Sequence, residues 1–211
     1  MTSVKICGLS TPETLACAVS SGARYVGFVF YPPPPRNVSF DIAWNLARAV
    51  PTGVRSVGLF VNPSDEELER ILTGIQLDMV QLHGDESPGR INEIKERFSM
   101  PVIKAIRVAS EDDLSDVEGY ESAADWLLFD AKPAGAKLPG GTGESFDWNI
   151  LKDRDFKKPW MLSGGLDASN VKDALNILKP NSLDISSGVE SAPGIKDTAK
   201  IKSFIDAVKA A

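Results

Sequence analysis

Short apolar runs rich in β-branched residues recur along the chain, at intervals of roughly 20 to 30 residues. Eight of these runs have the length and bounding residues typical of strands. They are residues 4–9 (VKICGL), 25–30 (YVGFVF), 56–61 (SVGLFV), 79–84 (MVQLHG), 102–108 (VIKAIRV), 125–130 (DWLLFD), 160–165 (WMLSGG) and 182–188 (SLDISSG). More polar stretches separate them, so the pattern predicts parallel strands joined by helical crossovers.

Four of the intervening stretches carry helix-start signals or apolar residues at helical spacing. The stretches are residues 10–19 (STPETLACAV), 62–72 (NPSDEELERIL), 169–178 (SNVKDALNIL) and 197–211 (DTAKIKSFIDAVKAA). Pro12 follows a Ser-Thr pair, an arrangement that favours the first turn of a helix. Ser64 is a candidate N-cap, because three acidic residues follow it at the positive end of the helix dipole.

Eight strand–helix units in 211 residues predict a single (β/α)₈ TIM barrel, with residues 1–211 forming one catalytic domain. An open doubly wound sheet of five or six strands would leave the chain too long. No linker divides the sequence: the Pro-rich residues 31–37 and the Gly-Pro-rich residues 131–145 fall where loops after strands 2 and 6 belong. The second loop is long enough to predict a functional or mobile segment.

The composition excludes several classes of partner. A net charge of −6 argues against a nucleic-acid binder, since phosphate backbones select clustered Lys and Arg. The two cysteines, Cys7 and Cys17, form no disulfide framework and lack partners at metal-ligand spacing. The N-terminal residues have no apolar signal core, and no apolar run is long enough to span a bilayer. We therefore expect a cytoplasmic protein without a metal.

Polar side chains gather at the predicted C-terminal ends of the strands, where a (β/α)₈ barrel carries its active site. They are Cys7, Arg36, His83, Asp130 and Asp184. Polar groups in apolar strands cost free energy unless they are paired or used in function. Four of them also have a plainer interpretation: Cys7 as an inert core thiol, Arg36 as a solvated cation, His83 as a hydrogen-bonded structural residue and Asp130 as a carboxylate that caps a loop.

Three glycine clusters follow predicted strands: residues 140–143 (GGTG), 163–166 (SGGL) and 186–191 (SSGVES). Glycine lets backbone N–H groups approach an anion closely, and loops after strands 7 and 8 often bind phosphate in this fold. The pattern predicts a small phosphorylated substrate held by Gly143, Gly164, Gly165, Ser187 and Gly188. Backbone amides would also explain how an acidic protein binds an anion.

Several of these segments together resemble the phosphoribosylanthranilate isomerase family of tryptophan biosynthesis. They are VKICGL, GFVF followed by PPRNVS, VGLFVN, VQLHGDE, LLFDAK, GGTGESFDW, LSGGL and LDISSGVESAPGIKD. The resemblance runs in order from residue 4 to about residue 205. KICG near the start, together with DxSSGVE near the end, separates this family from other phosphate-binding barrels.

The resemblance implies an aldose–ketose isomerase that performs an Amadori rearrangement without metal or cofactor. Its substrate would be N-(5-phosphoribosyl)anthranilate and its product 1-(2-carboxyphenylamino)-1-deoxyribulose 5-phosphate. By position, Cys7 matches the general base and Asp130 the general acid. Arg36 matches the residue facing the anthranilate carboxylate, Asp184 matches one that contacts the bridging amine, and His83 is grouped with these substrate-binding residues.

Two alternatives stay open, as does the choice between a monomer and a homodimer. One is the related phosphoribosyl aldose–ketose isomerase of histidine biosynthesis, where two aspartates are the expected acid–base pair. The other is a non-catalytic phosphosugar-binding barrel, which needs neither Cys7 nor Asp130. In the favoured interpretation, Lys5 shares a strand face with Cys7 and favours its thiolate, while apolar neighbours such as residues 127–129, or neighbouring negative charge, keep Asp130 protonated.

Overall fold

The computed structural model describes residues 2–32, 35–132 and 145–211, and its eight parallel strands close into a barrel. The strands are Ser3–Cys7 (β1), Tyr25–Val29 (β2), Arg55–Phe60 (β3), Met79–Leu82 (β4), Val102–Val108 (β5), Trp126–Ala131 (β6), Trp160–Leu162 (β7) and Ser182–Ile185 (β8). Each pairs with the next, and β8 pairs with β1. The predicted (β/α)₈ fold is confirmed.

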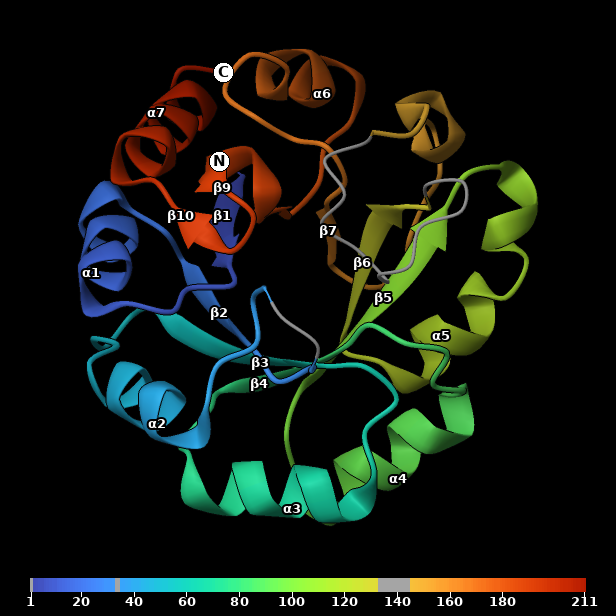
Figure 1. The fold of residues 1–211 in the computed structure, drawn as a ribbon. Helices are drawn as coiled ribbons and strands as arrows, with labels where there is room; N and C mark the ends of the chain where they lie inside the picture. The colour runs from blue at the N-terminus through green and yellow to red at the C-terminus, as the bar shows by residue number, and fades with distance from the viewer. Residues whose placement is uncertain (1, 33–34, 133–144) are drawn as a thin grey trace.

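Within the described residues, seven helices surround the barrel, and Figure 1 shows them in a view with the strands at its centre. They are Pro12–Ser21 (α1), Phe40–Arg48 (α2), Asp65–Gly74 (α3), Pro88–Phe98 (α4), Val117–Ala123 (α5), Val171–Ile177 (α6) and Thr198–Lys209 (α7). The four stretches predicted to be helical correspond to α1, α3, α6 and α7. Thr11 caps α1 ahead of Pro12, and Ser64 caps α3, as predicted.

The structure differs from simple strand–helix alternation in two places. Between β6 and β7, the described residues 145–159 contain a single 3₁₀ turn, Trp148–Leu151, instead of a helix. After β8, the antiparallel hairpin Glu190–Ala192 (β9) and Ile195–Lys196 (β10) precedes α7 and was not predicted. β7 and β8 also end three residues earlier than predicted, because the glycine-containing segments after them belong to loops. The predicted functional loop lies mostly outside the described residues.

Strand alternation divides the core into two parts. Side chains facing outward pack with the helices in one large apolar cluster that includes Ile6, Phe28 and Phe204. Side chains facing inward form a second cluster in the lower part of the barrel: Tyr25, Val57, Met79, Ile103, Ala105, Leu128 and Met161. Several inward-facing residues nearer the C-terminal strand ends are polar, among them Cys7, His83 and Asp130, so the upper part of the barrel carries the candidate chemistry.

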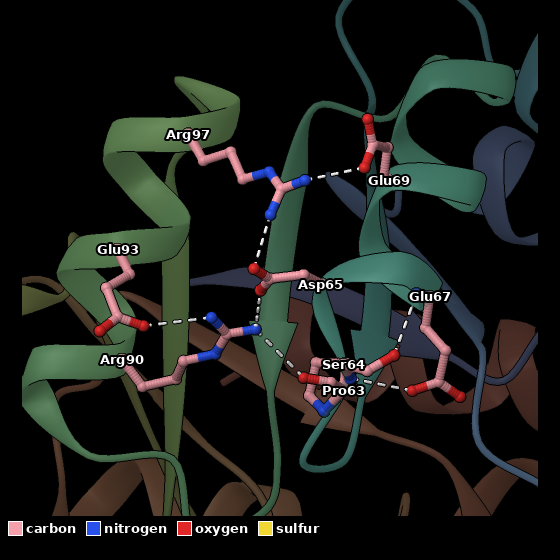
Figure 2. Close-up of polar contacts among 8 residues, drawn as sticks. All are labelled: Pro63, Ser64, Asp65, Glu67, Glu69, Arg90, Glu93 and Arg97. Atoms are coloured by element: carbon pink, nitrogen blue, oxygen red, sulfur yellow. Dashed lines mark hydrogen bonds and ion pairs between the residues drawn. The ribbon is translucent and has the colours of Figure 1, made fainter.

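The start of α3 is stabilised by local hydrogen bonds and by ion pairs to α4. Ser64 Oγ accepts from the backbone N–H of Glu67, whose carboxylate accepts from the N–H of Ser64, so the two form a capping box. The Asp65 carboxylate pairs with two arginines of α4, Arg90 and Arg97 (Figure 2). Exposed ion pairs contribute little individually, so the cap is the stronger local determinant.

We expect Ser64→Ala to lower the free energy of unfolding by about 1 kcal/mol, because α3 loses the acceptor for an N-terminal N–H group. Ser64→Gly, which leaves that group open to water, should lower it by only a few tenths of a kcal/mol. Urea denaturation of both variants measures the difference. An equal decrease in the free energy of unfolding of the two variants, or no decrease in either, would show that the cap does not stabilise α3.

Candidate active site

A buried ion pair lies inside the barrel between β1 and β8. Lys5 Nζ donates to Asp184 Oδ1 at 2.7 Å, and the two residues are 0% and 4% exposed. Lys5 is also the register partner of Asp184 in the β1–β8 ladder, so the backbone pairing sets the two side chains side by side. Asp184, predicted to contact the substrate, is therefore placed within the barrel and engaged by a lysine.

Cys7 lies one step nearer the C-terminal end of β1, on the same face as Lys5. A Cβ atom built on Gly27 of β2 would lie 2.9 Å from Cys7 Sγ and 3.3 Å from Lys5 Nζ, so both groups converge beside this glycine. The predicted proximity of thiol and ammonium is thus present. Gly27 makes room for both, because any side chain there would collide with the sulfur.

Burial dominates the ionisation of the thiol. It raises the pKa of Cys7 above its ordinary value, and Asp184 adds to the shift, while Lys5 and Lys196 oppose it. Burial alone would lower the pKa of Lys5, but Asp184 and Cys7 together raise it. We expected Lys5 to favour a thiolate. In the free protein the effect of burial on the pKa of Cys7 outweighs that of Lys5, which favours the neutral thiol.

The turn after β1 is shaped by its neighbours. Gly8 has a φ of +79°, and a Cβ there would lie 3.3 Å from Arg36 Cδ and 3.4 Å from both Lys196 Nζ and Ser186 Oγ. Ser186 Oγ donates to the carbonyl of Cys7 at 3.1 Å. The left-handed backbone favours glycine here, and a side chain would also come into close contact with these three neighbours.

Arg36 is held by a carboxylate that no sequence prediction included. Its Nε and Nη2 donate to the two oxygens of Glu190, both at 2.8 Å, in a forked arrangement. Lys196 Nζ donates to the same carboxylate at 2.6 Å and to Ser186 Oγ at 3.0 Å. Burial lowers the pKa of Lys196 although Glu190 opposes the shift. The β9–β10 hairpin thereby fixes Arg36 beside the end of β1.

Asp130 and His83 meet across the barrel from Cys7. His83 Nε2 lies 3.1 Å from Asp130 Oδ2, and the backbone N–H of Ala131 donates to Asp130 Oδ1 at 3.0 Å. His83 Nδ1 lies 3.0 Å from the amide nitrogen of Gln81. All three side chains are buried, and the polar partners of Asp130 are His83 and the N–H of Ala131, whereas Leu127 and Phe129 pack in the outer cluster on the other face of β6.

The loops after β7 and β8 pack together. Gly164 and Gly165 have φ values of +88° and +60°, and their N–H groups donate to no acceptor within residues 2–32, 35–132 and 145–211. A Cβ on Gly164 would lie 2.6 Å from the nitrogen of Ala131, and one on Gly188 would lie 2.0 Å from the oxygen of Leu166. Side chains are therefore excluded here by packing alone. Ser187 lies next to Gly188 in a 3₁₀ turn, and Gly143 lies outside the described residues.

Strand order places these groups around the barrel mouth in a definite sequence. Asp130 ends β6, the glycine loops follow β7 and β8, Cys7 ends β1, and Arg36 follows β2. The candidate phosphate loops thus lie between the candidate acid and the candidate base. Arg36 follows the next strand after the base, and the Glu190 carboxylate from the segment after β8 reaches it there.

Three polar residues at the site were not predicted: Gln81, Glu190 and Lys196. Gln81 interrupts an apolar strand, which is the same signal that identified His83 two residues later. Glu190 and Lys196 lie within a stretch quoted for the family resemblance, but their burial depends on a hairpin that the apolar pattern does not reveal.

Two further features concern metals and membranes. Across the described parts of the chain, no group of three or more His, Cys, Asp or Glu side chains is arranged to hold a metal ion. None of the helices that the structure describes combines the length and the apolar character needed to cross a membrane.

Because burial favours the neutral thiol, we expect Cys7 to ionise only above about pH 8.5, the ordinary value for a free cysteine. The measurement is a titration of thiolate ultraviolet absorbance in the substrate-free protein. Cys7→Ser is the control, since subtracting its curve removes the contribution of Cys17. If Cys7 instead ionises below that pH, the effect of Lys5 and Lys196 on its pKa outweighs the effect of burial.

A known protein family and individual proteins of known identity are similar to this chain over nearly its whole length. The family model described as N-(5'phosphoribosyl)anthranilate (PRA) isomerase matches residues 4–207. An N-(5'-phosphoribosyl)anthranilate isomerase of Paracoccus denitrificans is 52% identical over 204 residues, which cover 96% of this chain and 95% of that protein.

Two crystal structures are also similar over the full length of both chains. The phosphoribosyl anthranilate isomerase of Thermotoga maritima superposes with a TM-score of 0.91 at 39% identity. A structure of the enzyme in complex with reduced 1-(o-carboxyphenylamino)-1-deoxyribulose 5-phosphate has a TM-score of 0.87 at 38% identity. With this agreement in sequence and fold, the chain belongs to the N-(5'-phosphoribosyl)anthranilate isomerase family.

Proposed function

We propose that the protein isomerises N-(5-phosphoribosyl)anthranilate to 1-(2-carboxyphenylamino)-1-deoxyribulose 5-phosphate in tryptophan biosynthesis. The main support is the placement of Cys7 and Asp130 at the ends of β1 and β6, with the glycine loops of β7 and β8 between them. A phosphorylated sugar bound in those loops would extend between an acid and a base. Both cysteines are free thiols, which fits a reaction in the cytoplasm.

The chemistry requires one proton donor and one proton acceptor. Asp130, in its protonated form, would deliver a proton to the furanose oxygen, and the ring C–O bond would break as the anilino nitrogen supplies its electron pair to form an iminium ion. Cys7, as thiolate, would then remove the proton from C2 to give an enolamine. Tautomerisation to the ketone completes an intramolecular isomerisation that needs neither metal nor cofactor.

Formation of the thiolate is the demanding step, because the free protein holds a neutral thiol. The iminium ion places a positive charge one bond from C2, and an opposite charge nearby favours the ionised form of a base. Lys5 and Lys196 already lower the pKa of Cys7 against the effect of burial. We infer that the cationic intermediate, together with Lys5 and Lys196, lowers the pKa of Cys7 enough for the thiolate to remove the C2 proton.

Recognition of the two ends of the substrate follows the strand order. The N–H groups of Gly164 and Gly165, with the 3₁₀ turn that contains Ser187 and Gly188, would hold the phosphate. Arg36, with its guanidinium plane fixed by Glu190, would face the anthranilate carboxylate from the opposite side of Cys7. Gly143 belongs to the same proposal but lies outside the described residues.

Asp184 and His83 have supporting roles in this proposal. Asp184 would contact the bridging amine while it neutralises Lys5 within the barrel. His83 would orient the Asp130 carboxyl group through the contact of Nε2 with Oδ2.

The alternative functions fit less well. An isomerase of histidine biosynthesis is expected to use an aspartate pair, whereas β1 presents Cys7 at this position. A barrel that only binds phosphosugars needs neither a buried thiol at one strand end nor a carboxyl group at the other.

We expect the purified protein to consume phosphoribosylanthranilate. The assay follows the loss of substrate fluorescence and identifies the ketose product. Asp130→Asn removes the transferable proton but keeps the side-chain shape, so kcat should fall by about 10² to 10⁴ with little change in KM. Cys7→Ser should lose a comparable factor, because a hydroxyl group is far less acidic than a thiol.

The variants also distinguish a catalytic Asp130 from a structural one. If its carboxylate only accepts the N–H of Ala131, an asparagine carbonyl would replace it and kcat would stay near the wild-type value. An active wild type with a fully active Asp130→Asn variant would therefore contradict the acid assignment. A wild type without turnover would contradict the proposed function as a whole.

A further inference from the structure

Gln81 is a buried polar residue that the proposed reaction does not use. It lies on β4, two residues before His83 and on the same inward face, and it is 0% exposed. Its amide nitrogen lies 3.0 Å from His83 Nδ1, on the side of the imidazole away from Asp130. The three side chains thus form a continuous line of contacts from the interior of the barrel to its rim.

The direction of hydrogen bonding along this line follows from the chemistry of the groups. An amide nitrogen donates and does not accept, so the Gln81 amide donates to His83 Nδ1. With Nδ1 acting as acceptor, the ring hydrogen lies on Nε2, which faces Asp130 Oδ2 at 3.1 Å. A ring with its single hydrogen on Nδ1 would instead turn a lone pair towards the carboxylate.

The other end of the Gln81 amide has no polar partner among the described residues. Oε1 is buried and accepts no hydrogen bond from any residue that the structure describes. An unpaired buried acceptor is unfavourable, so the amide orientation is not set by partners of its oxygen. The contact of its nitrogen with His83 is the polar interaction that holds it.

We propose that Gln81 is a positioning residue that keeps the hydrogen of His83 on Nε2, so that the imidazole donates to Asp130. Gln81 touches neither Asp130 nor the reacting atoms and acts through His83. The proposal rests on the acid role of Asp130 for its effect on catalysis, but the tautomer itself is independent of that role.

The consequence for the reaction concerns the carboxylate that remains after proton transfer. When Asp130 gives its proton to the furanose oxygen, the negative charge that develops is met by two donors, the N–H of Ala131 and Nε2–H of His83. A donor already in place stabilises the charge without reorganisation. Loss of the Gln81 amide would leave the ring free to place its hydrogen on either nitrogen.

The first test needs no variant. His83 is the only histidine of the chain, so tag-free protein with ¹⁵N-labelled histidine gives a single imidazole spin system. The two ring nitrogens have distinct ¹⁵N shifts when one is protonated and the other is not. We expect a protonated Nε2 and an unprotonated Nδ1 at neutral pH. A hydrogen on Nδ1, alone or in addition to Nε2, would overturn the proposal.

The second test removes the amide while keeping the volume of the side chain. Gln81→Met deletes the donor to Nδ1, so we expect a mixture of His83 tautomers and a fall in kcat of about 10- to 100-fold with KM little changed. Met79→Leu is the matched control, because it alters packing on the same face of β4 and leaves the Gln81 amide intact. We expect the control to keep both the wild-type tautomer and kcat.

The outcomes separate this proposal from the proposed function. Gln81→Met with the wild-type tautomer would show that Asp130 alone orients His83, and a shifted tautomer with unchanged kcat would remove Gln81 from catalysis. Either result overturns the positioning role while the isomerase activity of the wild type stands. Equal losses of kcat in Gln81→Met and Met79→Leu would reduce the effect to general packing and would also overturn it.

Discussion

The buried pair of Lys5 and Asp184 is the constraint on which the upper part of the barrel depends. Both groups are almost completely buried, and a charge buried without a partner would be strongly destabilising. The register of β1 against β8 places the two groups together, so their geometry follows from the closure of the barrel. Towards the N-terminal strand ends the interior holds the apolar cluster that includes Tyr25, Met79 and Met161, and above the ion pair lie the thiol and the two loops that meet at the barrel mouth.

Each polar cluster of the site joins elements that are distant in the sequence. Lys5 and Asp184 join the first strand to the last, and His83 and Asp130 join β4 to β6. Glu190 joins the loop after β2 to the β9–β10 hairpin. Because these contacts form only when the barrel closes, assembly of the site is coupled to the folding of the whole chain. The acid, the base and the candidate anion-binding groups are thereby held on rigid strand ends or on short loops next to them.

Much of the fold was predictable from local signals. Strand runs such as 102–108 have β-branched, apolar sequences, and helix starts such as the one at Ser64 have a local physical cause that tertiary contacts do not override. Inward-facing polar residues at strand ends also identified Cys7, His83 and Asp130 as candidates. The hairpin that carries Glu190 and Lys196 was missed, because it is short and its burial comes from contacts with Arg36 and Ser186.

The protonation state of Cys7 could not be predicted from the sequence, for a different physical reason. The sequence shows that a lysine shares its strand face, which suggests a stabilised thiolate. The degree of burial, which opposes that effect, depends on the whole barrel and cannot be deduced from the spacing of two residues. The same holds for Gln81, whose amide acquires a role only through the distance of its nitrogen from an imidazole on the next inward position.

A crystal structure of the protein with reduced 1-(o-carboxyphenylamino)-1-deoxyribulose 5-phosphate would test the central claim most directly. The account predicts that the phosphate binds the N–H groups of Gly164, Gly165 and Gly188, and that the anthranilate carboxylate lies against Arg36. The sugar carbons should then pass between Cys7 and Asp130. A phosphate bound away from the loops after β7 and β8, or a sugar out of reach of either side chain, would contradict it.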